Sequence, residues 1–445
     1  MKIINSCIFL LLSVFISGLK AQERDSLLTK DEVIRRALNE NYGIRIAENR
    51  VEVAENNQSI LNSGYLPSVT GIAGTTYDLN NRLTEPEEGE SLEQTGVENN
   101  AYRASVNLDY VLFDGLGRFY NYKSLREQYD LSQLDARETI ENTVLQLMSV
   151  YYEIARLTEN IEVLQQTLEI SKERETRASY QFEYGQSNNL AVLNARVDVN
   201  NDSVVLLQAR QDLSNTKRDL NVLLNREITA IGFEVDTTVG FIPKLQLESY
   251  LDRAAANNVS LLQIEKNMAI SAYNIKISKS GYLPAVGLTG SYGWNKNRSA
   301  ATAFFPGSTT TTDGLSAGIS LSWNLFDGGQ TIVRVRNAKI DYANQELLRE
   351  QIKLEVKRDI SNALNEYENK LFIYKIQEEN VSTNLNNFNR SREEFSLGQI
   401  TSIEFRQAQI NLLNARTSLN LAKYEAKLAE LQLLQLTGQL LNVEL

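Results

Sequence analysis

The side chains that most often perform chemistry are nearly absent from this 445-residue sequence. It has no histidine, and its one cysteine, Cys7, lies in an apolar stretch near the start of the chain. The usual general base, the Ser-His and Cys-His dyads and the commonest metal ligand are therefore missing. Carboxylate pairs such as Glu87 and Glu88 keep a carboxylate-based hydrolase open, but this pair lies in an acidic, loop-like stretch. We predict that the chain is not an enzyme and uses no cofactor or metal.

The first 21 residues are typical of a secretory signal peptide, 1–21, with Lys2 followed by an apolar run and small residues up to Ala21. Its removal takes away two of the 45 basic residues and none of the 56 acidic ones, so the net charge changes from −11 to −13. An acidic chain lacks the basic face that nucleic acids require, so no nucleic-acid partner is expected. No later apolar run reaches the roughly 18 residues of a transmembrane helix. We expect an exported protein without membrane-spanning helices.

Two short sequence motifs each occur twice. SGYLP stands at 63–67 and again at 280–284, and LFDG stands at 112–115 and 325–328. The spacing between copies changes from 217 to 213 residues, as a longer loop in the first copy would cause. Internal repetition at a fixed offset indicates a duplicated architecture. We predict two tandem repeats, 22–242 and 243–445.

Each repeat contains a long stretch suited to helix. Residues 87–242 and 307–445 contain no proline, and Gly185 and Gly398 are the only glycines in 118–231 and 330–437. A helical hairpin that turns at each glycine is expected, with a tip near 185 and another near 398. A helix over 118–184 would be about 100 Å long. Apolar residues repeat along it with the seven-residue spacing of a coiled coil, at Leu147, Ile154, Ile161 and Leu168.

Before each long helix the apolar period changes to two. Tyr102, Val106 and Tyr110 share one face of an extended segment whose other face is polar, and Leu315–Leu325 alternates in the same way. We predict β-hairpins at about 66–113 and 283–326, with strands near ten residues, the length that crosses an outer membrane.

The duplicated motifs would then stand at the joints between helix and strand. In SGYLP the proline ends a helix, the glycine permits the turn, and the tyrosine suits a membrane-water boundary. In LFDG the aspartate would cap the long helix that follows. Gene duplication of ordinary turns explains the repetition equally well, but it does not explain the strands flanked by aromatic residues. The predicted joint residues are Gly64, Tyr65, Pro67, Asp114, Gly115, Gly281, Tyr282, Pro284, Asp327 and Gly328.

Four strands cannot close a barrel, and an open sheet edge in lipid leaves backbone groups unpaired. Two copies would give eight strands with a filled interior, while three would give twelve and a water-filled channel. A conduit therefore favours three copies.

The sequence resembles the TolC-like outer membrane efflux proteins in its duplicated GYLP and LFDG and in the two tips, 182–196 and 395–409. The resemblance implies a mainly α fold with membrane β: a homotrimer with a 12-stranded outer-membrane β-barrel and a periplasmic α-barrel of long coiled-coil hairpins. It also implies a passive exit duct of a tripartite efflux pump or type I secretion system, located in the outer membrane with a long periplasmic extension. Its partners would be outer-membrane lipid, a periplasmic adaptor and an inner-membrane exporter.

By the same resemblance, the adaptor docks around the glycine of each tip, here Tyr184, Gly185, Gln186, Leu397, Gly398 and Gln399. Relatives close the pore with acidic residues six and nine positions after the second glycine. These positions hold Glu404 and Gln407, so the chain departs from the pattern at the second one. We take Glu404 as a gate-lining candidate, with a solvated helix face as the competing interpretation.

A periplasmic coiled-coil scaffold or adaptor without a pore is the alternative function. It would share the helical hairpins but would not need two aromatic-flanked β-hairpins. The acidic segment 78–101 resembles a surface loop, and the sequence does not specify the cargo.

Overall fold

The computed structural model describes residues 26–302 and 306–443, so the predicted signal peptide 1–21 lies outside the described residues. The chain divides into two compact units. Of the described residues, the helical unit contains 26–49, Leu134–Leu262 and 351–443, and the sheet unit contains those of Arg50–Gln133 and Gln263–Glu350.

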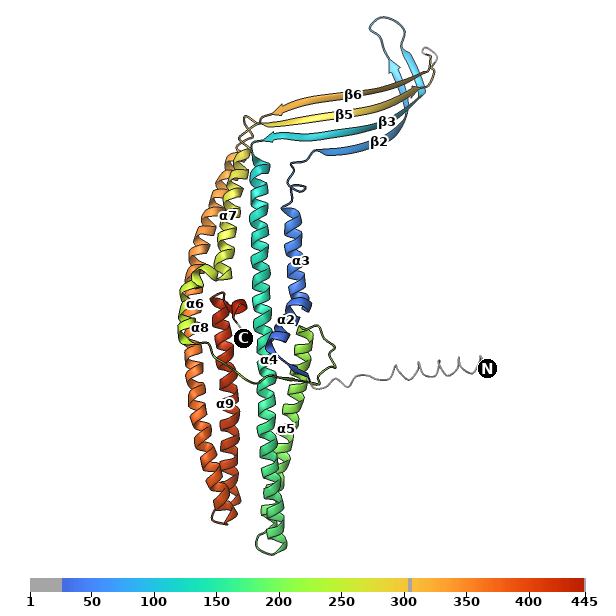
Figure 1. Cartoon of the computed structure of the whole chain (residues 1–445). Coiled ribbons are helices and arrows are strands. Elements are labelled where there is room, and N and C mark those ends of the chain that lie inside the picture. The colour runs from blue at the N-terminus through green and yellow to red at the C-terminus, as the bar shows by residue number, and fades with distance from the viewer. Residues whose placement is uncertain (1–25, 303–305, 444–445) are drawn as a thin grey trace, which may run out of the picture. The chain divides into compact units, whose positions relative to one another are not determined.

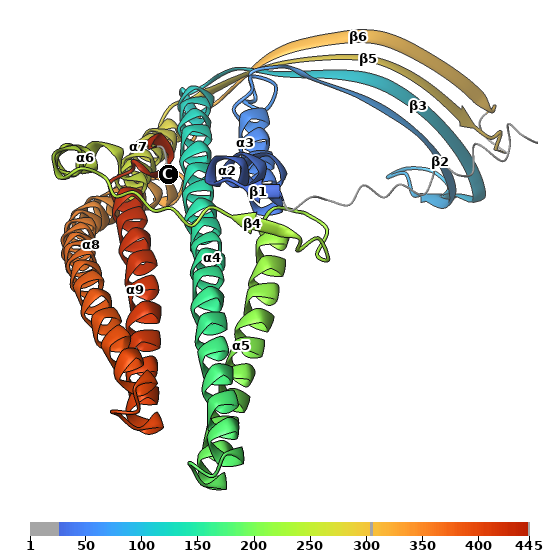
Figure 2. The same cartoon turned by 60° about the horizontal axis from the view of Figure 1, so that its bottom comes forward.

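The helical unit is dominated by two hairpins. The first joins α4 (Gly117–Glu183) to α5 (Asn189–Leu223), and the second joins α8 (Gln330–Ser396) to α9 (Ser402–Leu436). The four helices lie side by side in the order α8, α9, α4, α5, so that α4 and α9 are central (Figures 1 and 2). The shorter elements outside the four-stranded sheet are β1 (Ser26–Leu28), α2 (Lys30–Glu40), α3 (Tyr42–Asn57), β4 (Phe233–Val235), α6 (Lys244–Asn257), α7 (Val259–Ser280) and the 3-10 helix η1 (Leu440–Asn442). The end of α3, most of α7 and the starts of α4 and α8 belong to the sheet unit.

The central helices carry the core of this unit. Leu147 and Ile154 on α4 are fully buried, and Ile161 and Leu168 are less than a tenth exposed, as the seven-residue spacing predicts. Leu431 and Leu434 of α9 belong to the same buried cluster as Leu147. The short strands β1 and β4 pair in parallel beside it. The predicted class, mainly α with long coiled-coil hairpins, is confirmed.

The sheet unit contains one four-stranded antiparallel sheet in the order β2, β3, β5, β6. Its strands are β2 (Ser68–Thr84), β3 (Leu92–Asp114), β5 (Ala285–Ser299) and β6 (Ser308–Ser322). The register aligns Val106 with Tyr292 and Tyr292 with Leu315, which gives one apolar face. It aligns Asn107 with Ser291, and the Ser291 hydroxyl donates to Asn107 Oδ1 at 2.7 Å on the polar face. The predicted alternation therefore extends across the sheet.

The predicted strand length was wrong. The strands have 15 to 23 residues rather than about ten. The apolar alternation of β6 begins only at Leu315, but its preceding residues, Ser308–Asp313, still pair with β5. Backbone pairing does not need apolar side chains, so the hairpins continue beyond the apolar band.

The first helix-to-strand joint also differs from the prediction. Helix α7 continues up to Ser280, but α3 ends at Asn57, six residues before SGYLP. In the intervening turns the Asn62 side chain donates to Asn57 O, and Ser59 Oγ accepts from Leu61 N. Short polar side chains that bond to nearby backbone groups compete with helix continuation. Over the described residues, none of the helices combines the length and the apolar character needed to span a membrane.

Candidate functional site: the helical tips

Both tips turn in the same way. Gly185 and Gly398 have positive φ values of 71° and 74°. Just beyond each glycine, the N–H of Gln186 donates to Gln181 O at 2.7 Å, and the N–H of Gln399 donates to Glu394 O at 2.8 Å. This six-residue closure is the Schellman ending of a helix, which needs a left-handed residue that glycine supplies without strain.

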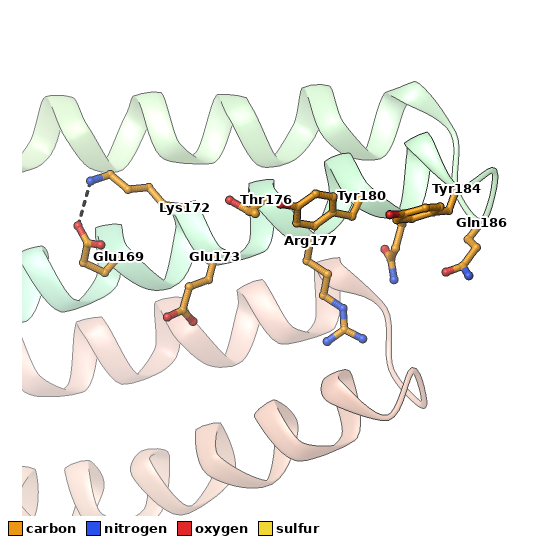
Figure 3. Close-up of a pocket in the computed structure, with 9 residues that line it drawn as sticks. Glu169, Lys172, Glu173, Thr176, Arg177, Tyr180, Tyr184 and Gln186 are labelled. Carbon is orange, nitrogen blue, oxygen red and sulfur yellow. Dashed lines mark hydrogen bonds and ion pairs between the residues drawn. The ribbon is translucent and has the colours of Figure 1, made fainter.

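The turn places large apolar side chains in solvent. Tyr184 is 75% exposed and Leu397 is 72% exposed. A groove of about 610 Å³ follows α4 from Glu169 and ends at Tyr184 and Gln186. Figure 3 shows its side chains in a row along α4, with Lys172 paired to Glu169 at 2.9 Å. Two of the three predicted docking residues of the first tip, Tyr184 and Gln186, therefore form the end of a groove.

Glu404 takes part in the start of α9. Its carboxylate accepts the N–H of Thr401 at 2.7 Å and the Thr401 hydroxyl at 2.8 Å, while Thr401 Oγ1 accepts the N–H of Glu404. This reciprocal arrangement is a capping box. The bond from the Thr401 N–H, followed by that from its hydroxyl, lowers the pKa of Glu404. Gln407 donates to Asn411 Oδ1 at 2.8 Å one turn further along.

A buried polar network behind the tips joins α9 to the first hairpin. Arg406 of α9 makes two bonds with Asp202 of α5, from Nη2 to Oδ1 at 2.7 Å and from Nη1 to Oδ2 at 2.8 Å. Its Nη1 also donates to Ser171 Oγ of α4 at 3.0 Å. Gln409 donates to Ser171 Oγ and to Thr167 O, which are both on α4. Together with the bonds to Asp202, these contacts attach α9 to both helices of the first hairpin.

Arg174 of α4 extends this network. It donates to Asp198 at 3.0 Å and to the hydroxyl of Ser402, the first residue of α9, at 3.0 Å. Burial lowers the pKa of Arg174, and the neighbouring Asp198 only partly offsets this. Burial also acts to lower the pKa of Arg406, but the bonds and charges of Asp202 and Asp198 outweigh it and raise that pKa. Two charged arginines are therefore held between the hairpins by two aspartates.

A second contact joins α4 to the end of α8. The guanidinium of Arg177 lies 4.6 Å from the centre of the Phe395 ring and donates to Ser396 O at 3.1 Å. Phe395 stacks on Phe405 with ring centres 4.8 Å apart, and Phe405 stacks on Phe388. The tip of the second hairpin thus has an aromatic core that the first hairpin touches through a cation.

The sequence analysis missed Arg174, Asp198, Asp202 and Arg406. Nothing in their local spacing joins them, because Arg406 and Asp202 are 204 residues apart. The capping box was visible, since Thr401 and Glu404 have the spacing of the S/T-x-x-E signature.

The structure brings the joint residues together in the sheet unit. A Cβ on Gly115, whose φ is +70°, would lie 2.5 Å from Ser280 O, and one on Gly281 would lie 3.0 Å from Thr331 Oγ1. Gly64 and Gly328 also have positive φ. These glycines permit both the turns and the close packing of the chain around them.

The two predicted caps act slightly ahead of their helices. Asp114 accepts the N–H of Arg118 at 2.8 Å, and Asp327 accepts the N–H of Thr331 at 2.9 Å. The helices begin three residues after each aspartate, at Gly117 and Gln330. Bonds from the Thr331 hydroxyl and from backbone N–H groups lower the pKa of Asp327.

The two tyrosines of the joints differ in their contacts. Tyr65 packs edge-on against Tyr122 under the guanidinium of Arg118. Tyr282 is about half exposed, and its carbonyl accepts Trp323 Nε1 at 3.1 Å. Pro67 and Pro284 each directly precede a strand, β2 and β5.

Known proteins share this architecture over most of the chain. The chain is 20% identical over 395 residues to the outer membrane efflux protein BepC of Brucella suis, covering 88% of this chain and 81% of BepC. It is 23% identical over 390 residues to the outer membrane protein TolC of Vibrio cholerae, covering 85% and 83%. The crystal structure of the Campylobacter jejuni CmeC outer membrane channel superposes with a TM-score of 0.75 at 17% identity, covering 95% of this chain and 90% of CmeC.

These likenesses favour the outer-membrane channel over the scaffold without a pore, and they place the protein in the outer membrane. The family model described as outer membrane efflux protein matches residues 33–226 and 250–439, two segments that together cover most of the sequence. The chain belongs to the outer membrane efflux protein family.

Proposed function

We propose that the two tips form the periplasmic gate of this outer-membrane exit duct, and that an adaptor protein opens the gate by docking on them. The observation that carries the proposal is the buried network behind the tips. Through Arg406 and Arg174 it couples the start of α9 to both helices of the first hairpin. A displacement of α9 at the tip therefore has to break or rearrange charge-assisted bonds.

The duct is proposed to be a homotrimer. Helices α5 and α8 are the lateral helices of the helical unit (Figure 2) and carry large exposed apolar side chains. Val204 and Leu207 on α5 are 65% and 64% exposed, and Leu354 and Phe372 on α8 are 71% and 63% exposed. Further copies of the chain would cover these surfaces and would also pair the free edges of β2 and β6. Three copies give the twelve strands of a channel with a water-filled interior.

In such a trimer Glu404 would contribute a ring of three carboxylates at the entrance. Gln407 is neutral, so a second acidic ring one turn away is missing. A single ring attracts cations less strongly than two would, and we expect modest cation preference. The capping box fixes the Glu404 carboxylate at the first turn of α9, which keeps the ring close to the tip.

The adaptor would select the open gate rather than force it. A partner shifts a conformational equilibrium only through its different affinity for the two states. Tyr184, Gln186, Leu397 and Gln399 would provide the docking contacts, with the α4 groove beside the first pair. An inner-membrane exporter would supply energy and choose the cargo, since the duct itself is passive.

The test is single-channel conductance of the purified protein in planar bilayers, with titration by divalent cations. Small cation-selective currents that divalent cations block, and a weaker block in Glu404→Ala, are expected. Glu394→Ala, which removes an exposed carboxylate from the end of α8, is the matched control and should behave as wild type. Equal block in both variants would remove Glu404 from the gate but retain the duct. Failure of folded trimers to form any channel would contradict the duct itself.

A further inference from the structure

Basic residues gather where the long helices follow the strands. Residues 115–126, at the start of α4, contain three basic residues and no acidic one, and residues 328–340, at the start of α8, have the same count. This is unusual in a chain with 56 acidic and 45 basic residues. The charge of these segments is therefore opposite to that of the protein as a whole.

The same pattern stands at equivalent positions of the two repeats. Phe119, Lys123 and Arg126 are exposed on α4, and Ile332, Arg336 and Lys339 are exposed on α8, each 213 residues later. The spacing of four and then three residues puts each trio on one helix face. We call these six residues the collar residues. Both faces thus carry an apolar residue next to the strand, followed by two cations.

Cations and aromatic rings are in contact in this region. Lys123 Nζ lies 4.7 Å from the centre of the Phe119 ring. On α7, Lys276 Nζ lies 5.2 Å from both Tyr120 and Tyr273, whose rings stack. An apolar body with a cationic end is the arrangement that places side chains at a membrane-water boundary.

Among the acidic residues near the collar, Asp341 is exposed two residues after Lys339, Glu127 next to Arg126 pairs with Lys266 at 2.9 Å, and the two that precede the helices are also engaged. Asp114 is 3.4 Å from Arg118 Nε, and Asp327 accepts bonds from Gly329 and Thr331. Arg118 also donates to Gly64 O, so its role is to hold the joint and it is not a collar residue. The collar cations therefore present a net positive charge to whatever adjoins the helix starts.

We propose that the collar residues bind the headgroups of anionic phospholipids in the periplasmic leaflet of the outer membrane. The phosphate of such a lipid would lie near the collar cations while its acyl chains contact the apolar face of the sheet and the Phe119 and Ile332 side chains. Lysine and arginine next to a membrane-spanning segment attract anionic lipid electrostatically. A water-filled lumen would not require an apolar residue on the same face as the cations, which favours lipid over an anionic cargo.

The chain contains a natural fluorescent probe, a tryptophan close to the collar. Of its two tryptophans, Trp323 directly follows β6 and is 53% exposed, seven residues before α8 begins, whereas Trp294 lies within β5. In the Trp294→Phe background, quenching of Trp323 by brominated lipids reports which lipid adjoins the collar. The full-length protein would be reconstituted in vesicles of brominated phosphatidylglycerol mixed with unlabelled phosphatidylethanolamine, or of brominated phosphatidylethanolamine mixed with unlabelled phosphatidylglycerol, at the same molar ratio.

We expect phosphatidylglycerol to compete roughly fivefold better than phosphatidylethanolamine. Replacing the four collar cations together, Lys123→Gln, Arg126→Gln, Arg336→Gln and Lys339→Gln, should bring the ratio close to one. The matched control removes four exposed cations of the helical unit, Arg210→Gln, Lys357→Gln, Lys375→Gln and Arg390→Gln, and should keep the wild-type ratio.

Salt gives a test that needs no substitution at the collar. At about 1 M NaCl the Debye length is about 3 Å, so the preference should largely disappear. Equal quenching by both lipids in wild type at low salt would overturn the proposal, as would a preference that survives in the collar variant. Quenching by either lipid shows that the sheet lies in the bilayer, so failure of this proposal is distinct from failure of the outer-membrane assignment.

Discussion

The two helical tips share a turn but differ in the helix that comes after it. Both turns close on a left-handed glycine with the same backbone bonds. Helix α5 then begins with Asn188 as its only side-chain cap, whereas α9 begins with the Thr401–Glu404 capping box. The first repeat has Ala191 where the second has Glu404. Duplication preserved the turn, and the carboxylate that caps the following helix stands only in the second copy.

The same contrast holds two residues further on. The first repeat has Leu193, which is 49% exposed, at the position equivalent to Arg406, whose side chain is 14% exposed. Arg406 reaches α4 and α5, but Leu193 makes no equivalent polar contact with the second hairpin. The first hairpin therefore serves as a platform, and Arg406 is a buried cation that the second hairpin contributes to the attachment. Because of this difference, we expect substitution of Arg406 in the second hairpin to have a larger effect than substitution of Leu193 in the first.

The largest effect is expected from Arg406→Ala. It leaves Asp202 as a buried charge without its cation, which costs about 3–5 kcal/mol when one partner of a buried pair is removed. We expect faster hydrogen-deuterium exchange over α9 near the tip and in α5 around Asp202. Leu193→Ala, at the equivalent position, should change exchange little because that side chain is half exposed.

Arg406→Lys refines this test. Lysine keeps the charge but cannot make the two parallel bonds to Asp202, so an intermediate effect is expected. If Arg406→Ala and Leu193→Ala gave the same exchange rates, the two tips would be equivalent and the network would not hold the second one.

Local signals predicted much of the architecture. The single glycine of 118–231 and that of 330–437 predicted both turns, and the period-two pattern predicted which strand residues share a face. The ends of the strands were not predictable, because Ser308–Asp313 pair through their backbone and carry no apolar signal. The attachment of Arg406 to Asp202 and Ser171 was not predictable either, since it depends on how two hairpins more than 200 residues apart pack.

The capping box shows a different limit. The spacing of Thr401 and Glu404 predicts the capping box from the sequence alone. By the resemblance to TolC-like proteins, Glu404 also stands where relatives have a gate carboxylate. The structure shows the carboxylate bonded to Thr401, and this bonding is compatible with a ring at the entrance. One residue can therefore serve a local helix start and a pore, and sequence spacing alone does not separate the two.

Acidification is expected to have an effect of intermediate size on the order of the second tip. The pKa of Glu404 is lowered from 4.5 in the folded protein, so its contribution is present above that value and is lost as pH falls through the folded pKa. Asn188 does not titrate, so the first tip should not respond in this way. A nitroxide label on Gln399→Cys should become more mobile below pH 4.5, and one on Gln186→Cys should not.

The labels report on single sites because the chain's one cysteine, Cys7, lies in the predicted signal peptide. Glu404→Gln should remove the response of the second tip to acid. A response of equal size at both tips would show that acid acts through groups other than Glu404.

The smallest difference between the tips is expected at the glycines themselves. Gly185→Ala and Gly398→Ala place an alanine at φ of 71° and 74° with nothing within 4 Å of the new Cβ, so backbone strain is the only cost. That cost is about 1 kcal/mol at each position. Gly240→Ala is the control, since its surroundings are equally open and its φ is not in the left-handed region.

Hydrogen exchange at the two turns should therefore rise by the same factor in Gly185→Ala and in Gly398→Ala. A larger rise in Gly398→Ala would mean that the network behind the second tip depends on the shape of its turn, and the shared turn would no longer be independent of the helix that it precedes.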